Sequence, residues 1–413
     1  MAHAADIRTQ AMAAAMAIIA DHGVAALSIR DLAQAIGKST TVIVNLFQTK
    51  AGLLAATAEA AMEMDAAFHA RFLAQTDGAP LNRQTLRVLA MGYIIGRAAP
   101  EAHFVRVWEE FLTDREAVMA AGPQLRAWAQ LRQRAWAELL ARAPTFSRLA
   151  PVLEPYLTME ALYASALAGR ADYQLLLGEA LDGLMARGLD APPPTTPVIE
   201  WIEAGLVPPQ PPGLEAGSMK LRLLDIAANL IMEGGVGAVT NRSVTQLAKA
   251  STSTILYHFG DMRGFVAEAI WHSVFREIPP YLDWRRPLDL QRPADLDDWA
   301  RLMATTLQPA SPDGQAGFYV KYARLIAQIC LLARRDPAFQ DLAALLRGPE
   351  GGGTYARREA IWPPQFVLTR MSAAHFAIWI KGRALLDAAI APTEETTPED
   401  RLRVAALAFA SHA

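Results

Sequence analysis

The chain has 413 residues, a formal net charge of −3, 52% hydrophobic residues and 20% charged residues. This composition is typical of a folded protein with a large core and excludes a disordered chain. The slightly acidic balance excludes a basic field over the whole surface, so any nucleic-acid binding has to rest on a local patch. A single cysteine, Cys330, excludes an internal disulfide, and no secretion signal or bilayer-spanning run is visible. These features predict a cytoplasmic protein without membrane insertion.

The first elements in chain order are three short helices followed by a longer one. Residues 7–21 are rich in alanine and methionine, and Gly23 provides a stop signal. Ser28 is suited to cap a second helix that ends at Gly37. Ser39 is suited to cap a third helix that runs through Phe47, and a longer helix is expected over 52–75. Two short helices joined by a few residues predict a helix-turn-helix.

The segment 23–55 occurs a second time at 235–267, without a gap and at a constant offset of 212 residues. Eleven of the 33 paired positions are identical, where chance would supply about two or three. The identical pairs include Arg30 with Arg242 and Phe47 with Phe259. We interpret this as an internal duplication that divides the chain into two similar halves.

The second copy repeats the same order of elements. A helix is expected over 221–232, with glycines 234 and 235 as its stop. Thr240 is suited to cap the second helix of this copy, and Ser251 the third.

The rest of each half also shows helical patterns. In the first half, helices are expected over 82–98, 100–113, 123–142, 158–187 and 198–205. The proline-rich stretch 207–218 predicts a stiff linker and a domain boundary. In the second half, helices are expected over 294–307, 315–332, 337–346, 364–390 and 398–410, with a glycine-rich loop at 348–353. No alternating strand pattern is visible, so the predicted fold class is all-α.

The repeated segment resembles the DNA-binding domain of TetR/AcrR-type transcriptional regulators. The shared pattern is a cap, an arginine, apolar pairs, a short turn, Ser-Thr and a phenylalanine before a long helix, and Tyr257-His258-Phe259 matches the usual end of the recognition helix. The resemblance covers about 50 residues in each half. Departures occur where the usual tyrosine is Val44 or Leu256, where the turn glycine is Lys249, and where the lysine matching Lys50 is Met262. Arg263, one residue later, is a candidate to take the place of that lysine.

This resemblance implies two tandem TetR-like units, each a helix-turn-helix domain followed by a helical ligand-binding and dimerisation domain. Regulators of this type usually pair their last two long helices into a four-helix bundle. Here residues 158–187 and 198–205 would pair with 364–390 and 398–410 inside one chain. The implied arrangement is an intramolecular pseudo-dimer. The alternative is that each half pairs across two chains.

The domain division predicted from the repeat and the linker has five parts. They are a first helix-turn-helix domain at 1–50, its helical domain at 51–206, the linker at 207–218, a second helix-turn-helix domain at 219–262 and its helical domain at 263–413.

Residues near the start of each recognition helix are expected to contact bases, and the flanking cations and hydroxyls are expected to contact phosphates. The DNA-binding candidates are Arg30, Lys38, Thr40, Thr41, Val44, Asn45, Lys50, Arg242, Lys249, Thr252, Ser253, Tyr257, His258 and Arg263. For Arg30 and Arg242, a surface pairing with nearby acids is an equally good interpretation.

The resemblance also implies a pocket for a small effector in the helical domains. The candidates are the aromatic and histidine side chains His103, Trp108, Tyr163, Tyr173, Trp299, Phe318, Tyr322, Trp362, His375 and Trp379. Most aromatics at helical spacing are core residues, so two or three of these are expected to line a cavity. No metal-ligand cluster, phosphate loop or nucleophile motif is visible, which predicts that the chain is not an enzyme and needs no cofactor.

The leading hypothesis is a transcriptional repressor that binds double-stranded DNA, is released by an apolar or aromatic small molecule and is monomeric. Its two unlike recognition helices suit a non-palindromic operator. The alternative is a ligand-binding or protein-interaction module of the same fold that has lost DNA binding in one or both halves.

Overall fold

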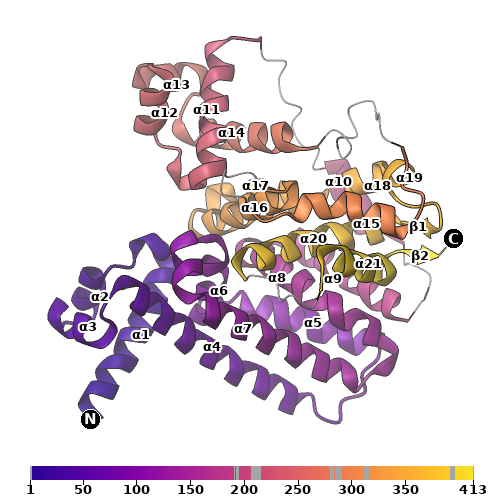
Figure 1. Cartoon of the computed structure of the whole chain (residues 1–413), viewed down its shortest axis with the longest axis horizontal. Helices are drawn as coiled ribbons and strands as arrows, with labels where there is room; N and C mark the ends of the chain where they lie inside the picture. The colour runs from indigo at the N-terminus through magenta and orange to yellow at the C-terminus, as the bar shows by residue number, and fades with distance from the viewer. Residues whose placement is uncertain are drawn as a thin grey trace.

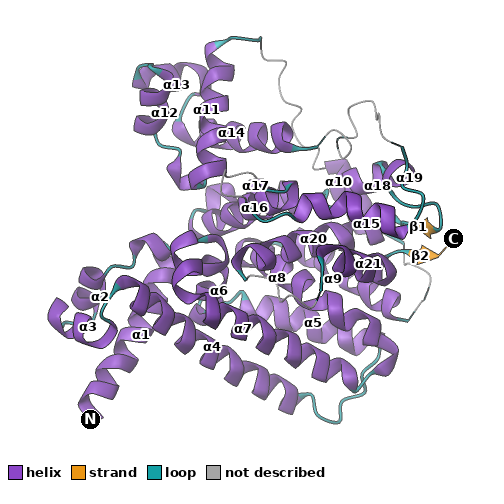
Figure 2. Cartoon of the chain, in the orientation of Figure 1, coloured by secondary structure: helices purple, strands orange, loops and turns teal. Residues whose placement is uncertain are grey.

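The computed structural model describes residues 2–189, 191, 195–205, 215–279, 283, 291–310, 316–390 and 396–412. These residues form an almost entirely helical molecule, which confirms the all-α prediction (Figure 2). A small antiparallel ribbon, which the sequence did not indicate, joins β1 (Phe366–Val367) to β2 (Ser411–His412). Within the described residues, no helix combines the length and the apolar character that crossing a membrane would need.

The helices of the first half agree with the expected order but not with every expected boundary. They are α1 (Ala2–His22), α2 (Ile29–Ala35), α3 (Thr40–Phe47), α4 (Lys50–Gln75), α5 (Arg83–Arg97), α6 (His103–Thr113), α7 (Arg115–Ala141), α8 (Ala150–Leu167), α9 (Ala171–Gly188) and α10 (Pro197–Gly205).

Two boundaries in the first half were predicted wrongly. The helix expected to begin at Pro123 begins at Arg115, because the Asp114 side chain accepts a hydrogen bond from the Ala117 amide at 2.8 Å. Pro123 lies inside α7, just after a kink at Ala121. The single helix expected over 158–187 is two helices, α8 and α9, which are separated by a turn at residues 168–170.

The second half repeats the plan with a different set of lengths. Its helices are α11 (Met219–Gly234), α12 (Asn241–Ala248), α13 (Thr252–Phe259), α14 (Met262–Glu277), α15 (Leu296–Ala304), α16 (Phe318–Arg335), α17 (Gln340–Arg347), α18 (Gly352–Ala356), α19 (Arg358–Ile361), α20 (Arg370–Ala389) and α21 (Pro398–Phe409). The helix expected from Pro364 begins at Arg370 instead, because Thr369 caps it and the residues before the cap belong to β1. Most of the predicted linker, from 207 to 214, lies outside the described residues.

The two copies of the repeat fold in the same way despite an exchange of glycine positions. Ser28 and Thr240 cap α2 and α12 as predicted, each accepting a hydrogen bond from a backbone amide at 3.1 Å. Ser39 and Ser251 begin α3 and α13, but their side chains do not accept the expected cap bond. The turn before the recognition helix has a positive φ in both copies, with glycine at 37 and lysine at 249. The residue just after that helix also has a positive φ in both copies. Here the first copy has glutamine, at 48, and the second copy has glycine, at 260.

The two halves are joined through a continuous hydrophobic core. Helices α8 and α9 of the first half pack against α20 and α21 of the second, and buried side chains from 86 to 410 form one cluster (Figure 1). The backbones of α8 and α20 approach closely, since a Cβ added at Gly382 would lie 1.8 Å from the Pro155 carbonyl oxygen. The buried carboxylate of Glu160 binds the Arg347 guanidinium at 3.0 and 3.1 Å across this contact.

One histidine at this contact makes the stability depend on pH. The Nε2 atom of His375 donates to the Ala180 carbonyl at 2.7 Å. Burial lowers the pKa of His375 to about 4, although the bond to Ala180 acts in the opposite direction. In the unfolded chain the imidazole titrates near pH 6.5, so the unfolded state binds an additional proton as the pH falls below that value.

We therefore expect this group to contribute a loss of stability of up to about 3 kcal/mol between about pH 6.5 and 4. The variant His375→Gln lacks that contribution. Urea unfolding of both proteins from pH 7.5 to 4.5 checks this, since the gap between their free energies of unfolding should shift in favour of the variant at low pH. A gap that stays constant over this range would contradict the prediction.

Candidate nucleic-acid interface

The two recognition helices bury one face and expose the other. In α3, Ile43 and Phe47 are buried while Val44 and Asn45 are exposed. In α13, Ile255 is buried, whereas Tyr257 keeps 85% of its surface exposed. A large aromatic side chain with so little burial on its own molecule is uncommon in a folded domain and is available for a partner.

Most of the predicted DNA-binding side chains are exposed around these two helices. The exposed group consists of Arg30, Lys38, Thr40, Thr41, Val44, Asn45, Arg242, Lys249, Thr252, Ser253, Tyr257 and Arg263, while Lys50 and His258 are half-buried. Twelve of the fourteen predicted DNA-binding side chains are thus accessible to a partner.

Two of the predicted phosphate contacts are already paired with carboxylates. The Nζ atom of Lys50 lies 2.7 Å from Glu116 of α7, and the Arg263 guanidinium lies 3.5 Å from Asp336. Both pairs tie the start of the long helix after the recognition helix to the helical body. These exposed pairs contribute little stability, so each cation is able to exchange its carboxylate for another anion.

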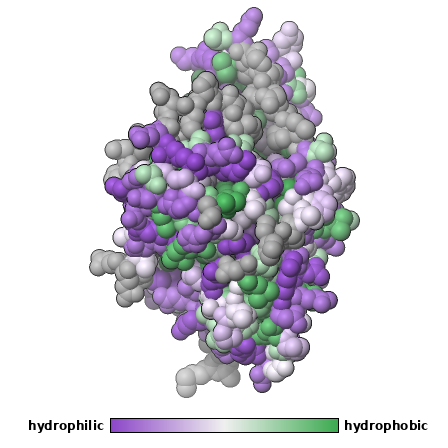
Figure 3. Space-filling view, turned by 90° about the vertical axis from the view of Figure 1, so that its right-hand side faces the viewer, coloured by the Kyte–Doolittle hydropathy of each residue, from purple (hydrophilic) through white to green (hydrophobic). Residues whose placement is uncertain are grey.

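Both helix-turn-helix units project from the same end of the molecule, α1–α3 below and α11–α13 above in the left part of Figure 1. The opposite end, where α15 and the β1–β2 ribbon lie, shows hydrophilic residues interspersed with smaller hydrophobic groups (Figure 3). The two recognition helices therefore share one end of a single chain.

Helix α16 contacts the beginning of both helix-turn-helix units. At its end, Arg334 donates to the Ala20 carbonyl at 2.8 Å and to Glu110 of α6 at 2.9 Å, and Arg335 also binds Glu110. One turn and a half earlier, Gln328 lies against Gly235, the counterpart of Gly23. A helix of the second half thus helps to set the position of the first DNA-binding domain.

A cluster of buried charged side chains occupies the centre of the first helical domain. The Asp65 carboxylate of α4 binds Arg97 of α5 at 2.5 and 3.1 Å and accepts from the Trp128 indole at 2.6 Å. Arg132 of α7 lies between Asp65 and Glu154 of α8, at 3.8 and 3.5 Å. Burial raises the pKa of Asp65, but Arg97 and His69 outweigh it and hold that pKa well below its usual value. The space between α4, α5, α7 and α8 is filled by these side chains.

The predicted ligand-binding residues do not form one site. Phe318 and Tyr322 line a cavity in the second half, together with Trp271, Glu350 and Lys381, which the sequence analysis did not select. The remaining candidates lie elsewhere, and most of them are buried. Trp299, Trp362 and Trp379 pack around Phe376, and Trp108 packs on Trp128. Tyr173 binds Glu160, Tyr163 binds Glu350, His375 lies between the halves, and His103 is half-buried at the start of α6.

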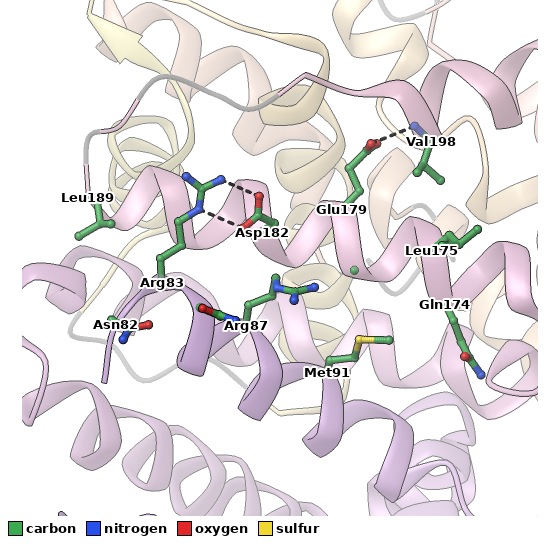
Figure 4. A pocket seen from close by; sticks show the side chains of 12 residues that line it. Asn82, Arg83, Arg87, Met91, Gln174, Leu175, Glu179, Asp182, Leu189 and Val198 are labelled. Atoms are coloured by element: carbon green, nitrogen blue, oxygen red, sulfur yellow. Dashed lines mark hydrogen bonds and ion pairs between the residues drawn. The ribbon is translucent and has the colours of Figure 1, made fainter. Parts of the chain in front are cut away.

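A second and more open groove lies on the surface between α5 and α9 (Figure 4). Arg83 and Asp182 bridge it with two bonds of 3.0 and 2.6 Å, and Glu179 accepts from the Val198 amide at its edge. Among its charged side chains, Arg83 and Asp182 are thus engaged with each other, and Glu179 with the backbone. Among the described residues, no group of three or more His, Cys, Asp or Glu side chains is arranged to hold a metal ion.

The exposed recognition helix, its capped partner and the buried phenylalanine define a helix-turn-helix DNA-binding domain. Residues 11–57 match the family model described as bacterial regulatory proteins, tetR family. The N-terminal domain of this chain is therefore of the tetR type, and the match supports a DNA-binding transcriptional regulator of that family. No curated protein matches the chain.

Proposed function

We propose that this chain is a transcriptional repressor built from two TetR-like units, 1–206 and 219–413, joined by the linker 207–218. The observation that carries the proposal is the exposure of α3 and α13 at one end of a chain whose halves share one core. Each unit contributes one helix-turn-helix domain, at 1–50 and 219–262. The two helix-turn-helix domains of this one chain correspond to those that two separate subunits contribute in a dimer.

The operator that fits this arrangement has two unlike half-sites. Two recognition helices reach adjacent major grooves when the half-sites are about 34 Å apart, one helical turn of DNA. The exposed residues differ between the copies, with Asn45 in one and Tyr257 in the other at matching positions. A symmetric dimer imposes a palindrome, whereas these two helices do not.

Arg30 and Arg242 serve as phosphate contacts in this proposal, because they are exposed beside the recognition helices. We expect Arg30→Ala and Arg242→Ala each to weaken DNA binding on all sequences and to reduce the slope of log K against log salt by about 1. Footprinting on the DNA upstream of its own gene, followed by titrations at several salt concentrations, measures both effects.

The matched control is Arg301→Ala on α15, an exposed arginine on the opposite end of the molecule that pairs with Asp298. It should leave both affinity and salt slope unchanged. A loss for only one of the two test variants would mean that a single unit contacts DNA. No protected site at low salt would contradict the proposed function.

The internal pairing predicts a monomer in solution. The surfaces of α8, α9, α20 and α21 that two subunits would use are already buried against each other. Sedimentation should give a mass near 44.8 kDa. A mass near twice that value would contradict a monomeric regulator.

The second candidate is a module of this fold that has lost operator recognition. The pairing of Lys50 with Glu116 and of Arg263 with Asp336 favours it, because both cations are bound to their own chain. The footprinting experiment above separates the two candidates. In the repressor proposal, a small apolar or aromatic effector releases the DNA, and the chain is neither an enzyme nor dependent on a cofactor.

A further inference from the structure

The second half contains a cavity of about 380 Å³ between α14, α16, α17, α20, the turn 349–351 and α18, which begins at Gly352 inside the stretch 348–353 that was expected to be a loop. This volume lies within the range of small-molecule sites in proteins. Its walls include two pairs of nearly parallel aromatic rings. Trp271 and Phe275 of α14 stack at 5.8 Å with an angle of 29° between their planes, and Phe318 and Tyr322 of α16 stack at 5.3 Å with an angle of 20°. Such walls favour flat, apolar molecules that stack on ring faces.

A buried ion pair forms the polar part of the lining. The Lys381 ammonium, which is 2% exposed, binds the Glu350 carboxylate and donates to the Ala377 carbonyl at 3.1 Å. The other oxygen of Glu350 accepts from the Tyr163 hydroxyl at 2.6 Å. A lysine ammonium has three N–H donors, and the third is on the side of the Tyr322 ring, 5.2 Å from Nζ to its centroid.

The charges around the cavity are already balanced. Lys381 is paired with Glu350, and Glu203 at the rim is paired with Arg370 at 2.7 Å. Burial lowers the pKa of Lys381, and Glu350 opposes that shift, so a further cation beside it is unfavourable. An anionic ligand is unfavourable as well, because the carboxylates of Glu350 and Glu203 would repel it. Because an unpaired charge is costly to bury, an uncharged ligand is favoured.

We propose that this cavity binds one uncharged, flat, apolar molecule, and that an acceptor atom of this molecule takes the third N–H of Lys381. The corresponding space of the first half is filled by Asp65, Arg97, Arg132 and Trp128. Among the described residues, the first half thus has a buried ion cluster where the second half has a cavity. The role of the bound molecule as an effector rests on the function proposed above, whereas its binding does not.

A pair of fluorescent probes that differ in one charge tests the ligand class. N-phenyl-1-naphthylamine is uncharged, and 8-anilinonaphthalene-1-sulfonate carries the same rings with a sulfonate. Titrations of the full chain should show one uncharged probe bound per chain, and at least about tenfold weaker binding of the anion at the same site. Equal or tighter binding of the anion would overturn the proposal.

Variants locate the site. Trp271→Ala and Phe318→Ala each remove one ring of a different wall, and each should weaken the uncharged probe at least tenfold. The matched control is Met91→Ala in the open groove between α5 and α9, which should change nothing. A loss of binding in Met91→Ala with normal binding in the other two would place the probe in the groove and overturn the proposal.

The hydrogen bond from Lys381 has its own readout. The uncharged probe 6-propionyl-2-(dimethylamino)naphthalene has one carbonyl, and its emission moves to longer wavelength when that carbonyl accepts a hydrogen bond. The double variant Lys381→Met with Glu350→Gln removes both charges together and leaves no buried charge unpaired. Its bound probe should emit at shorter wavelength than in the wild type. An unchanged spectrum, with binding retained, would overturn the assignment of Lys381.

DNA binding is measured in parallel on the same proteins. Probe binding without any DNA footprint would contradict the repressor function and leave the ligand site standing. A DNA footprint without probe binding would contradict the ligand site and leave the repressor function standing. A footprint that weakens as the uncharged probe saturates the cavity supports both.

Discussion

Replacing Gly382 by alanine is expected to lower the free energy of unfolding by at least about 3 kcal/mol, because the added methyl group has no room between α8 and α20. Its Cβ would lie 1.8 Å from the Pro155 carbonyl oxygen and 3.3 Å from Met159. A backbone oxygen in a buried helix cannot swing aside as the end of a flexible side chain can. The helices would have to separate, which would loosen the contact that joins the two halves.

The matched control is Gly92→Ala on α5, where the glycine is exposed and a Cβ would meet nothing within 4 Å. Both substitutions gain the same intrinsic preference of alanine for helix, worth up to about 1 kcal/mol. The control should therefore be neutral or stabilising. Urea unfolding followed by circular dichroism compares the two, and equal free energies for both variants would mean that α8 and α20 are not in such close contact.

Asp65→Asn is expected to destabilise the first half by about 3–5 kcal/mol, which is the usual cost of removing one partner of a buried ion pair. The change keeps the shape of the side chain but leaves the guanidinium of Arg97, and that of Arg132 beyond it, without their shared carboxylate. The pKa of Asp65 is lower in the folded than in the unfolded state, so its contribution is present above about pH 4 and is lost as the pH falls.

The control for this prediction is Asp77→Asn, since Asp77 also pairs with an arginine but is 84% exposed. A surface pair of this kind is worth less than about 1 kcal/mol. Thermal unfolding at pH 7 should separate the two variants clearly. A loss for Asp65→Asn no greater than that of Asp77→Asn would show that the buried cluster contributes nothing to the fold.

The sequence predicted the local structure well where chemistry within a few residues decides it. Ser28 and Thr240 cap their helices, and Gly23 and Gly235 adopt the positive φ that ends the first helix of each copy. The prediction was wrong for residues 158–187, where one apolar helical pattern continues through the turn at 168–170. Apolar periodicity does not mark such a turn, because both helices are buried on most sides.

The candidate ligand site was only partly predictable. Phe318 and Tyr322 of α16 line the cavity, whereas Trp299 of α15 and Trp362, just after α19, pack against each other. All four are aromatic residues in mainly apolar surroundings of the sequence, and the neighbours across the fold decide which of them line a cavity. Lys381 lay within an apolar run and gave no local signal of a partner 31 residues away.

The duplication, the all-α class and the two helix-turn-helix motifs could be predicted from the sequence, because repeats, caps and glycine turns are encoded by neighbouring residues. The tertiary structure decided how the halves differ: the ion cluster that closes the first, the cavity in the second and the contact that joins them. Those features depend on partners far apart in the chain, such as Glu160 with Arg347 at a separation of 187 residues. No local pattern specifies such pairs, since their energy arises only when folding removes both charges from water.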